Sequence, residues 1–283
     1  MLAVAKLQHD FGVEVCGVDL STAMNDETFS EIESAFFAGQ LMVFCDQRLS
    51  PAQFHSFAKR FGPPEPHVID QFHHPACSDI LVLSNVNKNG SPTGLADAGT
   101  YFHTDYSYLD VPARCTMLYS IVVPRIGGDT LFANQYAAYD DLSASMKTLI
   151  ENLVGLHHYG NRDDVDEASR TVASVLNDKQ KNRLNWVRHR IARAHPVTGR
   201  KALYAVSGSS FGIEGMPDNE AVALLDELKA HATQPKYIYS LKYGVGSLVI
   251  WDNASLLHSA TLIDPNDART LWRITIKEPG SHA

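Results

Sequence analysis

The chain has 283 residues, a formal net charge of −8 and 45% hydrophobic residues, which is ample for a large core. An acidic balance without a basic run argues against a nucleic-acid surface. No apolar stretch approaches the roughly 20 residues of a membrane span, and the N-terminus lacks the apolar run of a signal peptide. We therefore expect a soluble, cytoplasmic protein that binds neither nucleic acid nor membrane.

The first elements are predicted by spacing and by capping residues. Phenylalanine and isoleucine recur at helical spacing over 26–38, and Gly39 follows as a stop signal. The apolar run LMVF at 41–44 predicts a short buried strand. The sequence LSPAQFHSFAKRFG predicts a helix, because Ser50 and Pro51 form an N-cap and first-turn pair before an apolar face.

Strand signals dominate the second half of the chain. Residues rich in β-branched and apolar types, or in alternating aromatic types, predict strands over 111–123, 237–243, 247–251 and 270–277. Helical spacing predicts a helical region over about 133–153 and a helix over 218–232. The mixture indicates a mixed α/β (α+β) protein, with a β-barrel or sandwich covered by helices.

No linker rich in proline, glycine or serine divides the chain, so the simplest organisation is a single domain over residues 1–283. Segments at about 64–100 and 157–190 are polar and rich in Pro, Gly, Asp and Asn, and we expect them to lie outside the strand pattern as lids over a site. The four cysteines form no CxxC pair, and their spacing fits neither a zinc module nor a disulfide framework.

A candidate metal site begins at His103-Thr104-Asp105. In an extended segment, residues i and i+2 share a face, so an imidazole and a carboxylate could bind one metal ion. HxD alone is a weak signal, and a third ligand must come from far along the chain, where His258 follows a predicted strand. Two imidazoles and one carboxylate form the facial triad of non-haem iron(II), which leaves three positions open.

Two arginines near the C-terminus share one face of the last predicted strand. Arg269 and Arg273 would point the same way, about 13 Å apart at about 3.3 Å per residue. Guanidinium groups that face a barrel interior are costly unless they meet carboxylates, and arginine suits planar carboxylates well. Taken alone, the pair favours the alternative, two solvent-facing arginines on an edge strand.

Several motifs in order then resemble the TauD/TfdA family of iron(II)- and 2-oxoglutarate-dependent dioxygenases. The similar segments include FGVEVCGVDL, FHTDYSYLDVPARCTMLYSIVVP, GGDTLFANQYAAYDDL, HPVTGRKALY and LVIWDNASLLHSATLID. The resemblance covers nearly the whole chain and implies a double-stranded β-helix (jelly-roll) core with flanking helices. It also implies that the cofactors are Fe(II), 2-oxoglutarate as cosubstrate, and O2.

The resemblance assigns roles to individual residues. It implies that His103, Asp105 and His258 bind iron, and that Thr130 and Arg269 hold the distal carboxylate of 2-oxoglutarate. No catalytic residue beyond the metal site is expected, since the core reaction needs no protein acid–base pair. The substrate-binding candidates that follow from it are Arg273 for an acidic group, His67, Asp70, Ser209 and Tyr106.

Three positions depart from the taurine enzymes of this family. Asp70 stands where they have tyrosine, Gly99 where they have asparagine, and Ser209 where they have a pocket phenylalanine. The loss of aromatic bulk predicts a substrate other than taurine, larger or differently shaped.

The expected activity is oxidation, with hydroxylation favoured, of a small anionic organic substrate with release of succinate and CO2. One alternative keeps the cofactors but gives desaturation, or oxidative decarboxylation of the isonitrile-forming type, in a natural-product pathway. Another is a catalytically silent jelly-roll binding protein. Because members of the family are often homodimers or homotetramers, the resemblance leaves a homo-oligomer open.

Overall fold

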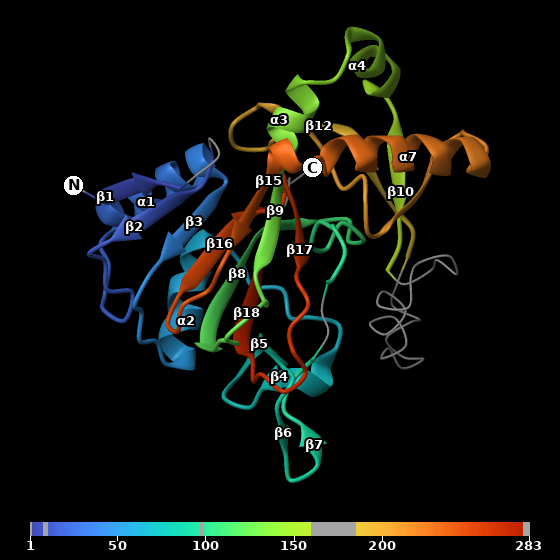
Figure 1. The fold of residues 1–283 in the computed structure, drawn as a ribbon. Coiled ribbons are helices and arrows are strands. Elements are labelled where there is room, and N and C mark those ends of the chain that lie inside the picture. The colour runs from blue at the N-terminus through green and yellow to red at the C-terminus, as the bar shows by residue number, and fades with distance from the viewer. Residues whose placement is uncertain (1, 8–10, 97–98, 160–184, 280–283) are drawn as a thin grey trace.

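A computed structural model describes residues 2–7, 11–96, 99–159 and 185–279 (Figure 1). Its largest element is an eight-stranded sheet in the order β1-β2-β3-β16-β8-β18-β5-β4. In that order the strands are β1 (Ala3–Lys6), β2 (Val13–Cys16), β3 (Leu41–Phe44), β16 (Leu248–Asp252), β8 (Ala113–Val122), β18 (Thr270–Lys277), β5 (Cys77–Ser84) and β4 (His73–His74).

A second sheet of three antiparallel strands faces the middle of the large one. It has the order β15-β9-β17, formed by β15 (Ile238–Leu241), β9 (Thr130–Asn134) and β17 (Leu256–Ala260). A cluster of buried side chains from both sheets fills the space between them, among them Leu118, Phe132, Trp251, Leu256 and Leu271. These two facing sheets are the jelly-roll core, so the expected fold class is confirmed.

Alternation along the strands separates the two faces of the large sheet. On β18, Ile274 and Ile276 pack into the cluster under the helices, whereas Leu271 packs into the cluster between the sheets. Arg273 has the same parity as Leu271, because neighbouring side chains of a strand point to opposite faces. The last strand therefore directs this arginine into the space between the sheets.

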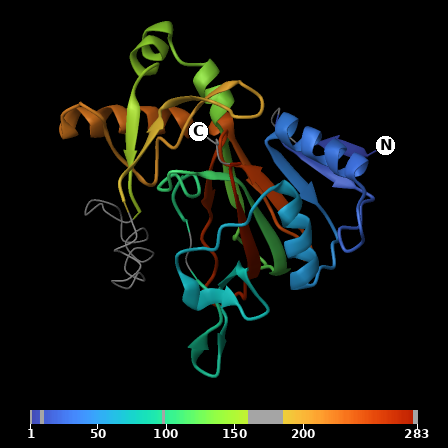
Figure 2. The ribbon, with the colours of Figure 1, turned by 180° about the vertical axis from the view of Figure 1, so that it is seen from behind.

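The outer face of the large sheet is covered by α1 (Asp26–Gly39) and α2 (Pro51–Ala58), as Figures 1 and 2 show. The Asn25 side chain caps α1, and α2 begins with a full capping box in which Ser50 and Gln53 exchange hydrogen bonds. A short 3-10 helix (Lys59–Phe61) continues α2 up to Gly62. Both predicted helices are confirmed.

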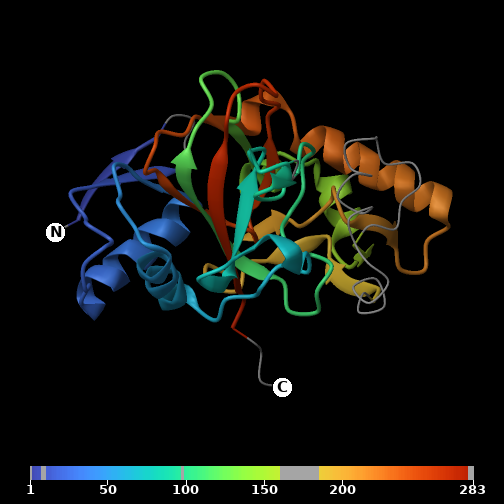
Figure 3. The same cartoon turned by 90° about the horizontal axis from the view of Figure 1, so that it is seen from below.

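Further helices and short sheets lie at the other side of the core (Figure 3). The helices are α3 (Gln135–Asp140), α4 (Ala144–Ile150) and α7 (Asp218–Ala232), and a 3-10 helix (Pro235–Tyr237) precedes β15. The strands are β10 (Val154–His157), β11 (Val187–Arg190) and β14 (Ser210–Ile213) in one sheet, and β12 (Ala192–Ala194) with β13 (Lys201–Leu203) in another. The single helical region expected over 133–153 is thus two helices, since β9 extends to Asn134 and Ser143 caps a new one.

The expectation that residues 64–100 lie outside the strand pattern is wrong in part. Residues 77–84 form β5, which pairs with β18 inside the large sheet. The run ILVLS within this segment has the apolar character of a buried strand. The rest holds a 3-10 helix (Asp70–Phe72), β4 and a hairpin of β6 (Asn87–Lys88) and β7 (Ser91–Pro92), which projects from one end in Figure 1. Most of the second expected lid, residues 160–184, lies outside the described residues.

Within the described ranges, no helix combines the length and the apolar character that crossing a bilayer requires.

Candidate metal and cosubstrate site

His103, Asp105 and His258 come together between the two sheets. Each offers one ligand atom, and these atoms lie within 4.8 Å of one another. His258 stands on β17, and His103 is held beside it by two reciprocal backbone hydrogen bonds, each 2.9 Å. The loop that carries the HxD motif is therefore fixed to the strand that carries the third residue.

The two imidazoles turn their Nε2 atoms toward Asp105. His103 Nε2 lies 3.6 Å from Asp105 Oδ1, and His258 Nε2 lies 3.6 Å from Asp105 Oδ2. The His103 Nδ1–H donates to the Tyr101 carbonyl at 2.8 Å, which leaves the Nε2 lone pair free toward the centre. This donor set fits a divalent metal ion, which bonds such atoms at about 2.0–2.2 Å.

The Asp105 carboxylate is buried and positioned by two neighbours. The Thr116 hydroxyl donates to Asp105 Oδ2 at 2.7 Å, and Asn253 Nδ2 donates to that hydroxyl at 3.0 Å. The Asp105 backbone N–H in turn donates to Asn253 Oδ1 at 3.3 Å. Thr116 lies on β8 and Asn253 follows β16, so the large sheet determines how the carboxylate is aimed.

Electrostatics keep Asp105 and His258 in the protonation states that bind a metal ion. Burial alone would raise the pKa of Asp105, but Arg273, His258 and His103 outweigh it and hold that pKa well below its ordinary value. Burial, aided by His103, holds the pKa of His258 well below its ordinary value as well. An ionised carboxylate beside a neutral imidazole is the state that binds a cation.

One cavity connects this cluster to both arginines predicted from the sequence. Its lining includes the three clustered residues, Thr130, Arg269 and Arg273, with Leu83, Leu118 and Trp251 from the large sheet. Thr130 Oγ1 lies 2.9 Å from the hydroxyl of Tyr243, whose pKa burial raises to about 12. Tyr243 thus remains a neutral hydrogen-bonding group.

Arg269 is 9% exposed and lines the cavity, just before β18. Burial lowers its pKa, and no carboxylate in the described part of the chain counters this effect. Its backbone N–H donates to Asn85 Oδ1 at 2.8 Å, which fixes the chain at this point. A buried guanidinium without a carboxylate partner is a strong site for an anion from outside the protein.

Arg273 reaches the cluster of His103, Asp105 and His258. Its Nη2 is 2.7 Å from Asp105 Oδ1, and its side chain is 11% exposed. The contact lacks hydrogen-bond geometry, since neither Nε nor Nη2 has a hydrogen-bond partner in the described residues. Tyr106 lies beside it, with the guanidinium carbon 5.6 Å from the ring centre.

The remaining predicted residues divide between the cavity and the surface. His67, Ser209 and Tyr106 line the cavity, and Tyr106 has a left-handed backbone with φ 55°. Asp70 is exposed on a 3-10 helix and is absent from the lining as far as the chain is described. The structure therefore places Asp70 apart from the other candidates.

Sequence reasoning missed the residues that support the cluster. No motif marks Thr116, Tyr243 or Asn253, although the alternation of tyrosines before Tyr243 and the position of Asn253 close to Trp251 offered a signal.

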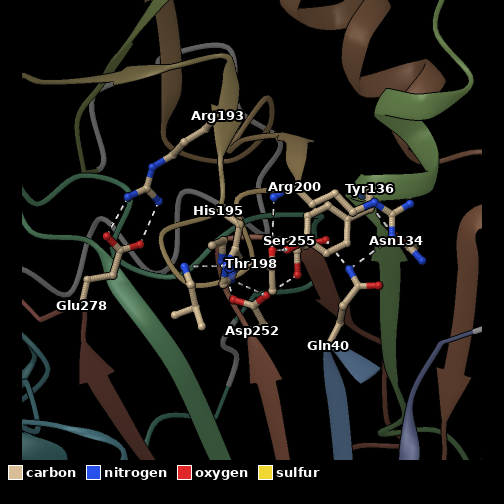
Figure 4. Close-up of polar contacts among 12 residues, drawn as sticks. Gln40, Asn134, Tyr136, Arg193, His195, Thr198, Arg200, Asp252, Ser255 and Glu278 are labelled. Carbon is tan, nitrogen blue, oxygen red and sulfur yellow. Dashed lines mark hydrogen bonds and ion pairs between the residues drawn. The ribbon is translucent and has the colours of Figure 1, made fainter. Parts of the chain in front are cut away.

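Behind these residues lies a buried polar network, shown in Figure 4. In it the His195 Nδ1 accepts hydrogen bonds from the N–H groups of Val197 and Thr198, so the ring proton lies on Nε2. His195 Nε2 donates this proton to Asp252 Oδ2 at 3.0 Å.

This network holds the turn between β16 and β17. The Ser255 hydroxyl also donates to Asp252, and Gln40 Nε2 donates to the Ser255 carbonyl at 3.1 Å (Figure 4). Asp252 directly precedes Asn253, and the turn leads into the strand that carries His258. The network thus fixes both the support of Asp105 and the third member of the cluster.

Comparison with known proteins agrees with this geometry. The family described as "Taurine catabolism dioxygenase TauD, TfdA family" matches residues 3–275. The alpha-ketoglutarate-dependent 2,4-dichlorophenoxyacetate dioxygenase of Cupriavidus pinatubonensis is 33% identical, over 97% of this chain and 98% of that protein. The (S)-phenoxypropionate/alpha-ketoglutarate-dioxygenase of Sphingobium herbicidovorans is 30% identical, over 96% and 94%.

A solved structure shows the same fold. The crystal structure of AAD-2 in complex with Mn(II) and N-oxalylglycine matches with a TM-score of 0.82 and 30% identity, over 99% of this chain and 98% of that one. The fold and the His/Asp/His cluster define a class of protein, the iron(II)- and 2-oxoglutarate-dependent dioxygenases. Within that class the chain belongs to the TauD/TfdA family, and it is an enzyme that uses Fe(II), 2-oxoglutarate and O2.

Proposed function

We propose that this dioxygenase hydroxylates a small anionic organic substrate and releases succinate and CO2. His103, Asp105 and His258 bind the iron, and Thr130 and Arg269 hold the distal carboxylate of 2-oxoglutarate. Arg273 binds the acidic group of the substrate. The bound iron supplies the activation of O2, and the protein binds and orients the two organic molecules and excludes water.

The observation that carries this proposal is the state of Arg273. Its side chain is largely buried and faces the cavity, yet two of its nitrogens find no hydrogen-bond partner in the described residues. Nη2 has only its ion pair with Asp105, and Nε has no partner in the described residues, so an anionic group in the cavity would supply the missing hydrogen bonds. The two relatives named above act on carboxylates by their names, which is the same chemistry.

The arrangement also separates the two anions. Arg269 lines the cavity with Thr130 and lies near Tyr243, which hydrogen-bonds to Thr130, whereas Arg273 lies beside Asp105 and Tyr106. Each arginine therefore has its own partners, and two carboxylates can bind without competing for one guanidinium. His67, Tyr106 and Ser209 complete the wall next to the substrate.

Lid segments belong to the same proposal. His67, Leu95 and Gly99 from the first expected lid, and Tyr159 at the start of the second, line the cavity. We expect the parts of residues 64–100 on either side of β5 to cover the bound substrate. Asp70 contributes only if this cover closes further inward.

Desaturation or oxidative decarboxylation remains the second candidate, because the same iron and cosubstrate serve all three outcomes and the substrate's pose selects among them. Membership of a family of dioxygenases speaks against the silent binding protein.

A screen of succinate release against small carboxylates, sulfonates and phosphonates tests the proposal. Mass spectrometry then distinguishes a gained oxygen from the loss of two hydrogens or of CO2.

With an active substrate, Arg273→Leu should raise the KM for substrate about tenfold to a hundredfold, and Arg269→Leu should do so for 2-oxoglutarate. Arg188→Leu, whose side chain is 60% exposed and pairs with Glu214, is the control and should change neither. If Arg273→Leu raised the KM for substrate and the KM for 2-oxoglutarate equally, the proposed separate roles of the two arginines would be contradicted.

A further inference from the structure

A second group of metal-ligating side chains lies between α2 and β5. His55 comes from α2, and Cys77 and Asp79 come from the start of β5. One ligand atom from each lies within 4.8 Å of the others, and His55 Nε2 is 2.7 Å from Asp79 Oδ2. Apart from the active-site cluster, it is the only group of this kind in the described ranges.

This group is separate from the active site. The described lining of the cavity includes none of the three residues, and α2 packs on the outer face of the large sheet. All three side chains are half-buried, whereas Ser78 between Cys77 and Asp79 is exposed. The group is therefore open to solvent on one side and can be reached by an ion without entry into the cavity.

Both elements hold their ligands rigidly. The capping box fixes the first turn of α2, and Phe54 and Phe57 on either side of His55 are buried in the core. β5, which carries Cys77 and Asp79, pairs with β18 further along, from Leu81 to Ser84. The donors are thus presented by packed secondary structure, which lowers the ordering cost of binding an ion.

The donor set suits zinc in particular. An imidazole nitrogen, a thiolate and a carboxylate are its three usual ligand types, with bonds of about 2.0–2.3 Å, and a water can complete a tetrahedron. In such a tetrahedron the nitrogen and oxygen would stand roughly 3.4 Å apart, so the present 2.7 Å contact must open by less than an ångström. Hard cations such as Mg²⁺ and Ca²⁺ prefer all-oxygen sites.

We propose that His55, Cys77 and Asp79 form a zinc-binding site that fastens α2 to β5. Binding replaces the Cys77 thiol proton, which leaves to solvent, by a thiolate–zinc bond, and His55 binds through Nε2 with its proton on Nδ1. The site stabilises the folded chain in proportion to occupancy and takes no part in the oxidation itself.

Cobalt(II) is the probe, because only a site with cysteine gives an intense thiolate-to-cobalt charge-transfer band in the near ultraviolet. Reduced, metal-free protein is titrated with Co(II), and the account predicts this band in the wild type and in His103→Ala, which lacks the active-site cluster. Cys77→Ser should abolish it and His55→Gln should weaken Co(II) binding at least tenfold. Cys16→Ser, which removes an exposed thiol elsewhere, is the matched control and should keep the band.

Zinc should also raise the melting temperature of His103→Ala but not that of the double variant with Cys77→Ser. Absence of the charge-transfer band from wild type would overturn the proposal, and so would its survival in Cys77→Ser. Loss of the band in Cys16→Ser would assign the thiolate to another site and overturn it equally.

Discussion

His103 is confined by two glycines that have no room for a side chain. Gly99 has φ +72°, and a Cβ there would lie 2.4 Å from His103 Cε1. Gly208 has φ +82°, and its Cβ would lie 2.6 Å from His103 Cβ. A Cβ at either position would push His103 aside. Glycine at both positions therefore allows the imidazole to lie where its Nε2 faces Asp105.

We therefore expect Gly99→Ala to displace the His103 ring and to weaken Fe(II) binding by about tenfold to a hundredfold. The measurement is the Fe(II) concentration that gives half-maximal succinate release. Gly90→Ala is the matched control, because Gly90 has a similar φ of +79° but nothing within 4 Å of the added Cβ. An unchanged Fe(II) requirement in Gly99→Ala would show that the ring position is not fixed by this contact.

Individual residues also show the limit of prediction from sequence. His103 and Asp105 are two positions apart, and an HxD motif can be noticed without a fold. Asn253 supports Asp105 through hydrogen bonds to Thr116 and to the Asp105 backbone, which join residues 137 and 148 positions apart. Such pairs depend on sheet register, which no local pattern encodes.

At the scale of elements, segments with a clear apolar pattern were predicted well, including the four-residue strand β3, and strands without one were missed. The helices at 26–38 and 218–232 and the strand at 270–277 are confirmed by α1, α7 and β18. The strand β5 was overlooked, because CSDILVLS follows a polar, proline-containing stretch and is only partly alternating. The position of β9 next to β17 could not be predicted either, since strand pairing is decided by tertiary contacts.

The alignment of β8 with β16 has a direct consequence for the active site. Thr116 on β8 donates to Asp105 Oδ2 at 2.7 Å, so Thr116→Val removes this bond and keeps the side-chain shape. We expect affinity for Fe(II) to fall about tenfold to a hundredfold while the sheet stays folded. Isothermal titration calorimetry measures this affinity, with Mn(II) in place of Fe(II) because Mn(II) does not react with O2.

Ser120→Ala on the same strand is the control. Its hydroxyl donates to the Gly244 and Ser247 carbonyls, away from the cavity, so it should cost stability without changing Mn(II) affinity. If both variants lost affinity equally, the effect would come from general loosening of β8.

The whole molecule assembles its active site from both sheets. The ligand cluster joins a loop at 103–105 to β17, and the arginines come from the segment at the start of β18 and from β18 itself. The resemblance of several ordered motifs made this set predictable in spite of the distances along the chain. The site that joins α2 to β5 was not predicted, because Cys77 has no cysteine partner and His55 lies on a separate element.

Folding as a whole should also depend on pH through His157. The side chain is 1% exposed, its Nδ1 lacks a partner in the described residues, and burial, aided by His189, lowers its pKa to about 3 from 6.5. At a pH between about 3 and 6.5, His157 is protonated in the unfolded chain and neutral in the folded chain. The free energy of unfolding therefore falls as the pH drops below about 6.5 and gains nothing from this residue above it.

We expect His157→Phe to remove this dependence. From pH 7.5 to 5.5, the wild type should lose about 1 kcal/mol more stability than the variant, as measured by urea unfolding. Identical pH slopes for the two proteins would mean that His157 is not buried as the neutral form.

The central claim is that His103, Asp105 and His258 bind an iron ion to which 2-oxoglutarate also binds. The most direct measurement is the visible spectrum of the protein with Fe(II) and 2-oxoglutarate in the absence of O2. The account predicts a weak charge-transfer band in the wild type that is lost in Asp105→Ala and persists in Cys77→Ser. A wild type without the band, or an Asp105→Ala protein that keeps it, would contradict the account.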